Sequence, residues 1–586
     1  MHSIFFLIFR RMRQPLLTLV STYAIAILGL TLIPGQDDAG NLWRMDFFHA
    51  FYFVSFMATT IGFGEIPYPF TDAQRLWVTF SLYATVVVWI YALGTLLALV
   101  QDKMFQQALV ERRFTRRVQR MREDFYLVCG YGETGSALTY ALTERDRSVV
   151  VIDIDPDRVN MLQLENLRQY VPALEGDAAQ PGCLLEAGLK HPRCRGVVAL
   201  TNVNEVNLKV AITSKLLHPE IKVICRSDSH DIEENMASFG TDYIINPFDT
   251  FANHLATALQ APGLYLLHSW LSGERRLPDP PIQPPTAGLW IVCGFGRFGR
   301  AVYRRLKREG IEPVVIESMP ELTGTPESGY VLGRGTEADT LLEAGIERAV
   351  GLVAGTDNDA NNLSIIMTAR QLRPELFVIL RQNHNGNQAI VDAVKADMVM
   401  HSSAIIANRI RVLLGTPLLY QFTSLALHQD DGWAQDLVSR IQRLVLSENP
   451  AIWEVFLDNE EALAVCDALL KGRKVTLGHL LTDPGERSRS QPAVCLLLRR
   501  EGQRMMLPEH DLLLKTGDRL LFCGRESARG RMEWGLQNHH ALKYILTGEV
   551  ASSGWLWGKF QRPGRPVSNE QVLESGGDKE RTIDPD

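Results

Sequence analysis

The sequence has few cysteines, little excess charge and none of the common hydrolase signatures. Its eight cysteines are scattered and form no CxxC pair, which excludes a disulfide-stapled mini-protein and indicates reduced thiols in a largely cytosolic chain. A net charge of −7 gives no support for nucleic acid as the main partner. No Ser–His–Asp order, HExxH motif or Walker lysine occurs, so we predict no catalytic residues. With 586 residues, the chain is long enough for about four domains.

Formal charge is also absent from two long apolar runs. Residues 14–36 and 76–101 are each long enough to cross a hydrocarbon core of about 30 Å as a helix. A signal peptide is an alternative for the first run, but too few residues precede Arg10, and charges follow that stretch where a cleavage site should be. Buried core helices are the alternative for both runs, but two such runs flanking a shorter one are unusual in a soluble domain. We therefore predict two membrane spans.

The positive charges near the two runs indicate their orientation. Three arginines lie just before the first run, and Lys103 with six arginines follows the second, whereas the loop between the runs contains only Arg44 and Arg75. The positive-inside rule therefore places both termini in the cytoplasm and predicts a multi-pass protein of the plasma membrane, in contact with lipid. No helix has arginine at every third position, so we expect no voltage sensor of the usual kind.

The segment between the runs, residues 46–65, is too short and too glycine-rich to span a membrane and suits a re-entrant segment. Its apolar part ends at Ala58 and is followed by TTIGFGE. Stacked backbone carbonyls can replace the hydration shell of K⁺, and glycine at alternate positions permits the positive φ that such a backbone needs. Glu65 would place carboxylates at the outer mouth and concentrate cations there. The predicted selectivity filter is Thr60, Ile61, Gly62, Phe63 and Gly64.

Residues 14–102 resemble the two-span potassium channel family, in which the filter reads TTVGYG. Ile61 and Phe63 replace Val and Tyr, and both variants occur in that family. The simpler alternative is a glycine-rich turn between two helices. The resemblance implies K⁺ ions in the filter and a homotetramer, because one chain would supply one quarter of the filter.

An internal repeat occupies much of the remaining chain. DFYLVCGYGETG, from Asp124, matches GLWIVCGFGRFG, from Gly288; in each copy a strand precedes GxGxxG, and an acid follows the last glycine by 18 residues. Alternating strands and helices predict a doubly wound parallel sheet in each copy. The first glycine allows a tight turn, the second lets the backbone approach a phosphate at the helix N-terminus, and the third packs the helix on the strand, while the acid suits a ribose hydroxyl. The predicted nucleotide-binding residues are Gly130, Gly132, Glu133, Thr134, Gly135, Asp153, Asp177 and Arg226 in copy one, and Gly294, Gly296, Arg297, Phe298, Gly299, Glu317 and Arg334 in copy two.

The glycine motif alone does not establish a ligand site in the second copy, because such a fold can persist after ligand binding is lost. Arg334 stands where copy one has Asp177, and it could contact an extra phosphate or be a solvated or interface side chain. A cluster of His230, Asp231, Glu233 and Glu234 leaves Ca²⁺ or another divalent cation open as a further ligand. A solvated loop or helix start is the simpler interpretation of that cluster, so we do not assign a metal site.

The arrangement from about residue 124 to 530 resembles the RCK (regulator of K⁺ conductance) domains that follow the pore in ligand-gated prokaryotic channels. The resemblance implies NAD or another adenine nucleotide as a regulatory ligand and eight lobes per tetramer. The predicted organisation is a cytoplasmic N-terminus (1–13), a pore domain (14–102), a basic helical connector (103–123), a first α/β Rossmann-like lobe (124–260), a dimerising helix and Pro-rich linker (261–287), a second Rossmann-like lobe with connecting helices (288–445), a small α+β C-terminal lobe (446–535) and a mostly disordered tail (536–586).

These patterns together predict a nucleotide-gated, potassium-selective channel that is not an enzyme. Two alternatives stay open. A non-conducting nucleotide-sensing subunit of a K⁺ transporter would account for the repeat but not for the two spans. A membrane-anchored NAD-dependent oxidoreductase would need a substrate domain where the second copy of the repeat lies.

Overall fold

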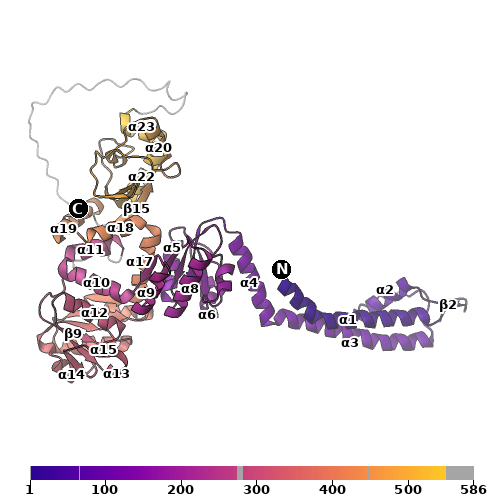
Figure 1. Cartoon of the computed structure of the whole chain (residues 1–586). Coiled ribbons are helices and arrows are strands. Elements are labelled where there is room, and N and C mark those ends of the chain that lie inside the picture. Colours follow the sequence, from indigo (N-terminus) through magenta and orange to yellow (C-terminus); the bar gives the residue numbers. More distant parts are fainter. Residues whose placement is uncertain (1, 65, 274–281, 447–448, 550–586) are drawn as a thin grey trace, which may run out of the picture. The chain divides into compact units, whose positions relative to one another are not determined.

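The structure is a computed structural model that describes residues 2–64, 66–273, 282–446 and 449–549 (Figure 1). The chain divides into two compact units, residues 1–256 with 284–411 and residues 257–283 with 412–586. The first unit contains the apolar helices and two six-stranded parallel sheets, and the second contains a four-stranded antiparallel sheet. The predicted architecture of a helical region, two Rossmann-like lobes and a small α+β lobe is therefore confirmed.

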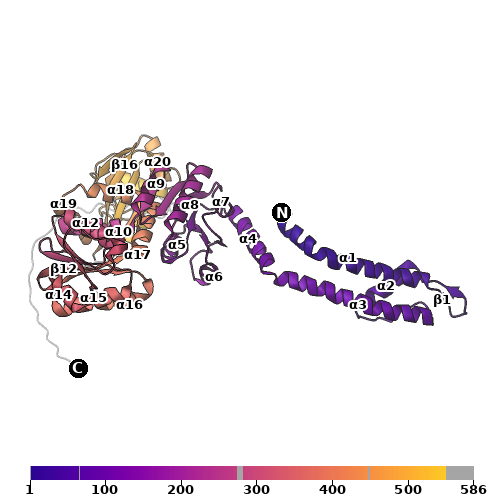
Figure 2. The same ribbon diagram turned by 60° about the horizontal axis from the view of Figure 1, so that its bottom comes forward.

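Two long apolar helices, α1 (His2–Leu32) and α3 (Asp72–Gln101), lie side by side (Figures 1 and 2). Within them, Arg11–Leu32 and Asp72–Gln101 are long and apolar enough to cross a membrane. The helices touch where the Trp77 ring lies against Gly29, and Trp77 Nε1 donates a hydrogen bond to the Ala26 carbonyl at 3.1 Å. A Cβ at Gly29 would lie 2.0 Å from that ring, so only glycine allows this contact.

Helix α1 begins at His2, so the helix extends beyond the predicted membrane span, which starts at residue 14. The charged residues before residue 14 do not end the helix, because arginine is a good helix former. Pro15 lies inside α1 and lacks the N–H that would bond the carbonyl four residues earlier. The first residue of the uncharged run therefore does not mark the first residue of the helix.

A short helix and a small ribbon connect α1 to α3. Strands β1 (Gly35–Gln36) and β2 (Leu42–Trp43) pair antiparallel, and α2 (Phe47–Ala58) follows. The Asp46 side chain caps α2 by accepting the His49 N–H at 2.7 Å. Six residues of α2 are buried: Ala50, Phe53, Val54, Phe56, Met57 and Ala58. Helix α2 therefore packs against the long helices and holds the segment that follows it.

Helix α4 (Lys103–Gln119) joins the apolar helices to the first lobe. Asp102 ends α3 and caps α4 by accepting the N–H groups of the second and third residues after it. Phe114 and Val118, near the end of α4, are buried in the hydrophobic core of the first lobe. The connector is thus anchored at one end to α3 and at the other to the lobe.

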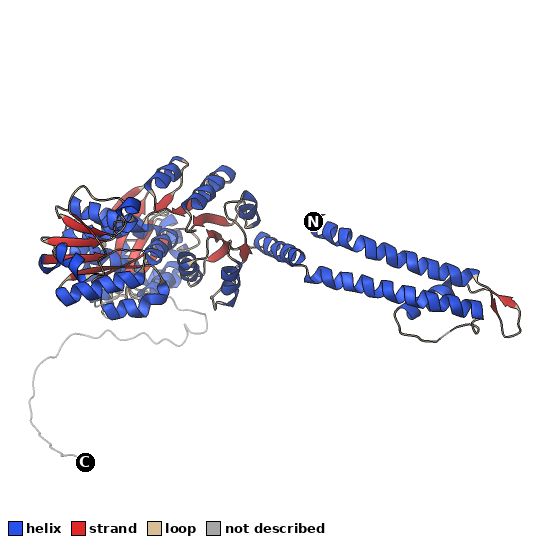
Figure 3. Cartoon of the chain, turned by 90° about the horizontal axis from the view of Figure 1, so that it is seen from below, coloured by secondary structure: helices blue, strands red, loops and turns tan. Residues whose placement is uncertain are grey.

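The first lobe has a parallel sheet in the order β5-β4-β3-β6-β7-β8, with helices around the strands (Figure 3). This order is that of the dinucleotide-binding fold, in which ligands bind at the carboxyl ends of the strands beside the point where the order reverses. Its strands are β3 (Phe125–Cys129), β4 (Ser148–Asp153), β5 (Ala173–Glu175), β6 (Cys194–Ala199), β7 (Lys222–Arg226) and β8 (Tyr243–Ile245). Its helices are α5 (Glu133–Thr143), α6 (Pro156–Leu164), α7 (Pro181–Glu186), α8 (Asn204–Leu217), α9 (His230–Ser238) and α10 (Pro247–Gln260).

The second lobe repeats this sheet in the order β11-β10-β9-β12-β13-β14. Its strands are β9 (Leu289–Cys293), β10 (Pro313–Glu317), β11 (Tyr330–Leu332), β12 (Ala349–Ala354), β13 (Phe377–Gln382) and β14 (Met398–His401). Its helices are α12 (Arg297–Arg308), α13 (Pro320–Thr323), α14 (Ala338–Glu343), α15 (Asp359–Leu372), α16 (Gln388–Val394) and α17 (Ser402–Gly415), with short 3-10 turns at Ile346–Arg348 and Asn385–Asn387.

The second unit has a sheet in the order β15-β18-β16-β17. Its strands are β15 (Ala451–Phe456), β16 (Ala493–Arg500), β17 (Gln503–Met506) and β18 (Arg519–Gly524). Its helices are α11 (Pro262–Leu271), α18 (Pro417–Ala426), α19 (Asp431–Val445), α20 (Leu463–Leu470), α21 (Leu477–Leu480), α22 (Glu526–Gln537) and α23 (His539–Thr547).

Helix α23 corrects one predicted boundary. The tail was predicted to begin at residue 536, but the chain forms this further helix, which Asn538 caps and which buries Ala541, Leu542 and Ile545. Burial of three apolar side chains on one face stabilises the helix. Most of the predicted tail, residues 550–586, lies outside the described residues.

Candidate functional site

The backbone of the segment after α2 alternates in handedness from Thr60 to Gly64. The φ angles of Thr60, Gly62 and Gly64 are +61°, +64° and +73°, so left-handed residues alternate with Ile61 and Phe63. Ile61 and Phe63 are 61% and 67% exposed in the single chain. The predicted outer-mouth residue, Glu65, lies outside the described residues.

Positive φ at Thr60 was not predicted, because a non-glycine residue rarely adopts it. The preceding turn holds it there: Thr60 N–H donates to the Met57 carbonyl and Ile61 N–H to the Phe56 carbonyl, both at 3.1 Å. The end of α2 therefore fixes the first peptide of the segment, where glycine is absent.

The two glycine loops have the same geometry. Gly130 and Gly294 have φ of +103° and +93°, and both form the turn after the first strand of their lobe. A Cβ on Gly135 would lie 2.0 Å from the Gly130 carbonyl oxygen, and one on Gly299 would lie 1.9 Å from the Gly294 oxygen. The first and third glycines therefore have the turn and packing roles that the sequence suggested.

The second glycine of each loop faces open space. A Cβ on Gly132 would come no closer than 3.5 Å to Arg158, and one on Gly296 would have no described neighbour within 4 Å. Each lies immediately before the first residue of its helix, where free backbone N–H groups favour an anion. This is the place at which a phosphate can approach the backbone.

The acid after the second strand of each lobe is buried and holds its glycine loop. Asp153 accepts a hydrogen bond from the Tyr131 N–H and another, at 2.8 Å, from the Asp155 N–H. Glu317 accepts the Phe295 N–H at 2.5 Å in the same way. Both carboxylates also line the clefts described below. Asp153 and Glu317 therefore also shape their glycine loops. The sequence had indicated only a contact with a ribose hydroxyl for these acids.

A buried asparagine fixes the opposite wall of each cleft. Asn207 is fully buried; its Oδ1 accepts from the Thr201 N–H at 3.0 Å, and its Nδ2 donates to the carbonyls of Thr201 and Arg226 at 2.9 and 3.1 Å. Asn362 makes the same bonds in the second lobe, to Thr356 and Arg381. The sequence TNVNEVNL, from Thr201, matches TDNDANNL, from Thr356, and these contacts explain that match. They also hold the backbone of an arginine at each strand end.

A cavity of about 510 Å³ lies over the first glycine loop. Of the residues predicted for this site, Gly130, Gly132, Glu133, Thr134, Asp153, Asp177 and Arg226 line it. The sequence analysis did not assign other lining residues to this cleft, which include Arg158, Asp228, Phe248, Arg381, His384 and Arg297, the last of which was predicted for the second copy only. Arg158, Asp228 and Phe248 lie in the first lobe outside its glycine motif, whereas Arg297, Arg381 and His384 reach the cleft from the second lobe and depend on how the lobes meet. The match of VILR, which ends at Arg381, to VICR, which ends at Arg226, indicates Arg381 for the second cleft and not for this one.

A cavity of about 550 Å³ lies over the second glycine loop. Its lining includes Gly294, Gly296, Arg297, Glu317 and Arg334 from the predicted set. The prediction that Phe298 contacts the nucleotide is wrong. Its side chain is fully buried and packs on Phe248 and Phe251 of α10, with ring centroids 6.2 and 5.5 Å away. An aromatic ring at this position contributes to the packing between the lobes and is not available to a ligand.

The residue after the second glycine reaches the other lobe in both copies. Glu133 Oε1 accepts the Asn385 N–H at 3.1 Å, and its carboxylate lies 3.9 Å from His384 and 3.8 Å from His401. Arg297 Nη1 lies 2.6 Å from Asp228 Oδ2. The two lobes therefore meet at their glycine loops, and each lobe contributes to the surroundings of the other's cleft.

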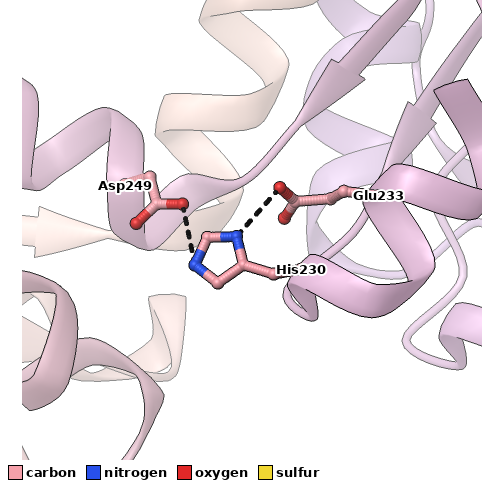
Figure 4. Close-up of side chains that lie close together, drawn as sticks. All are labelled: His230, Glu233 and Asp249. Carbon is pink, nitrogen blue, oxygen red and sulfur yellow. Dashed lines mark hydrogen bonds and ion pairs between the residues drawn. The ribbon is translucent and has the colours of Figure 1, made fainter.

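The acidic cluster on α9 differs from the predicted set. His230 and Glu233 lie together with Asp249 of α10, and not with Asp231 or Glu234 (Figure 4). The His230 ring nitrogens lie 3.3 Å from Glu233 and 3.6 Å from Asp249. Asn246 donates to the other Glu233 oxygen at 2.7 Å, and burial raises the pKa of Glu233. Hydrogen bonds within the protein account for this cluster, so it does not by itself indicate a metal.

Comparison with known proteins assigns three domains. Residues 16–102 match the ion channel domain, and residues 126–247 and 290–402 each match the TrkA-N domain. Over 230 residues the chain is 23% identical to Potassium channel protein 1 of Methanocaldococcus jannaschii. The aligned part covers 39% of this chain and 67% of that protein. Over 200 residues it is 24% identical to the voltage-gated potassium channel Kch of Escherichia coli, which covers 34% of this chain and 46% of that protein.

Among solved structures, the chain is similar to the GsuK channel bound to NAD, at 16% identity and a TM-score of 0.45. That alignment covers 91% of this chain and all of the GsuK chain.

Proposed function

We propose that this chain, which joins one ion-channel domain to two TrkA-N (RCK) domains as prokaryotic potassium channels do, is a potassium-selective channel gated by a nucleotide. The observation that carries the proposal is the alternating backbone of Thr60 to Gly64, which lies between two helices long enough to span a membrane. In the proposed assembly, a homotetramer in the plasma membrane, four copies of this segment surround one axis. Their carbonyl oxygens then replace the water around K⁺.

The exposure of Ile61 and Phe63 supports this assembly. A single chain leaves these apolar side chains, and the outer faces of α1 and α3, without cover. Large exposed apolar surfaces mark contacts with partners or lipid. Neighbouring subunits cover the filter side chains, and lipid covers the outer helix faces.

The first-lobe cleft is the regulatory nucleotide site. Gly132 and the N-terminus of α5 receive phosphate, and Asp153 and Asp177, which line the same cleft, contact ribose and base. NAD or an adenine nucleotide such as ADP fits these groups by class. The second-lobe cleft has the same phosphate-binding loop, but Arg334 replaces the second acid. Ca²⁺ is a further candidate ligand.

The connector transmits the ligand's effect to the pore. Helix α4 follows α3 directly, and its buried Phe114 and Val118 make it part of the first lobe's core. A lobe that moves when ligand binds therefore pulls on the cytoplasmic end of α3. A thousandfold change in the gating equilibrium needs about 4 kcal/mol, or about 1 kcal/mol at each of four sites, supplied by tighter binding to one state of the assembly.

The test is current through the purified full chain in a planar bilayer, with K⁺ and Na⁺ gradients and with NAD⁺, NADH, ADP, ATP and Ca²⁺ added in turn. We expect K⁺ current that changes with at least one nucleotide. Gly132→Ser should blunt that response and leave ion preference unchanged, because the glycine lies in the cleft and not in the pore. Loss of K⁺ preference in this variant would contradict the separation of roles.

A further inference from the structure

The two nucleotide clefts have a wall in common. Arg297, the first residue of α12, and Arg381, at the end of β13, line both the first-lobe and the second-lobe cavity. Both residues belong to the second lobe by sequence. The phosphate-binding groups of the two clefts are therefore not independent, although each cleft has its own glycine loop.

Contacts across the lobe interface hold these two arginines in place. Arg297 Nη1 lies 2.6 Å from Asp228 Oδ2, and the Asp228 side chain is only 7% exposed. The guanidinium groups of Arg297 and Arg381 lie 5.8 and 5.3 Å from the centroid of the same ring, that of Phe248. Two cations are thus placed on one aromatic ring between the clefts.

The shared wall holds more cationic hydrogen-bond donors than the protein itself satisfies. Arg381 Nη1 donates to the Gly355 carbonyl at 3.4 Å, but its buried Nε has no hydrogen-bond partner within the described part of the chain. Burial lowers the pKa of Arg381 and of Arg226. The nearby carboxylates of Asp357 and Asp228 partly oppose this, and the charge of Arg297 lowers both pKa values further. An anion beside these groups would relieve both the missing hydrogen bond and the repulsion.

We propose that phosphate groups bound in the two clefts compete for Arg297 and Arg381, so that a nucleotide in one lobe weakens binding in the other about tenfold. The inference rests on the proposed function, since it assumes that the ligand carries phosphate. The first anion takes up the charge and the donors of the shared pair. A second phosphate then finds both arginines already bound to the first phosphate, whose negative charge also repels it. The resulting coupling between the two binding affinities lies within the usual range for linked sites. Each chain therefore favours a state with one of its clefts filled.

The clefts also contain matched controls. Arg158 lines only the first cleft, and Arg334 lines only the second. Each cleft can be closed separately by placing serine at the second glycine of its loop, which faces open space. Gly296→Ser closes the second cleft and leaves the first available, and Gly132→Ser closes the first and leaves the second available. These variants allow each affinity to be measured alone and then compared with the wild type.

The experiment is calorimetric titration of the full chain in detergent with ADP. In the wild type we expect two sites per chain, with the second binding event about tenfold weaker than the same cleft shows when the other is closed. Arg297→Gln should weaken binding in both single-cleft backgrounds and remove the difference, while Arg297→Lys should retain part of both effects. Arg158→Gln should weaken only the first cleft and Arg334→Gln only the second. Thermal unfolding of each variant checks that it is folded.

The outcomes separate the inference from the proposed function. The competition would be overturned if each cleft bound ADP with the same affinity in the wild type as in the variant in which the other cleft is closed. That result would leave nucleotide gating intact. An effect of Arg297→Gln on one cleft alone, or no binding to the second cleft when the first is closed, would also overturn it. No ADP binding to either cleft of the wild type would overturn the inference, and the current recordings with the other nucleotides would then decide whether the gating proposal survives.

Discussion

Replacing Gly135 by alanine tests the packing of the first nucleotide loop. The added Cβ would lie 2.0 Å from the Gly130 carbonyl oxygen and 3.0 Å from its carbon, well inside the contact distance of about 3.5 Å. Helix α5 must then move away from β3 by more than about 1 Å, and the buried Leu138 and Leu142 must repack. Overpacking of this kind costs about 2 kcal/mol. In a lobe of this size that lowers the melting temperature by roughly 5–10 °C.

The assay is thermal unfolding of the full chain, with amide hydrogen exchange to locate the loss in the first lobe. Gly132→Ala is the matched control, because its Cβ would meet Arg158 only at 3.5 Å. We expect its stability to stay within about 0.5 kcal/mol of wild type and its ADP affinity to fall at least about tenfold, since the methyl group occupies the approach of the phosphate. The reasoning is refuted if Gly135→Ala melts like the wild type or if Gly132→Ala loses as much stability.

Three further predictions concern other parts of the chain. Asn207→Ala should destabilise the first lobe by about 2–4 kcal/mol and weaken ADP binding, measured by unfolding and calorimetry, because it strands buried backbone groups that hold Arg226. Gly62→Ala should abolish K⁺ current and leave ADP affinity unchanged, measured by bilayer recording and calorimetry, since its φ is +64°. Burial raises the pKa of Glu454 to about 7, so this carboxyl favours folding below about pH 4 and loses that effect as pH rises through 7. Glu454→Gln should have the same melting temperature as the wild type at pH 4. At pH 8 its free energy of unfolding should be higher than that of the wild type by up to about 3 kcal/mol.

The sequence was sufficient for features that depend on local spacing. The two glycine loops were predicted with the roles of their first and third glycines, because the turn and the close helix–strand approach are properties of a single strand–turn–helix unit. The two apolar helices were predicted from uncharged length alone. The positions of Gly62 and Gly64 in φ space follow equally from the need for a left-handed backbone.

Features that depend on how distant segments meet were not predictable. The opposite directions of Glu133 and Arg297, each toward the other lobe, follow from the packing of two repeats and not from either motif. Phe298 looked like a ligand contact because it lies inside GxGxxG, yet it packs on α10. Asp249 completes the His230 cluster from another helix, where sequence spacing does not point.

The central claim is that the backbone of residues 60–64 selects potassium, and the reversal potential of the reconstituted full chain tests it most directly. With equal K⁺ on one side and Na⁺ on the other, each tenfold preference for K⁺ shifts the potential by roughly 59 mV. We expect a shift of more than about 100 mV in the direction that opposes K⁺ flow. A potential near zero, with current carried equally by the two ions, would contradict the account.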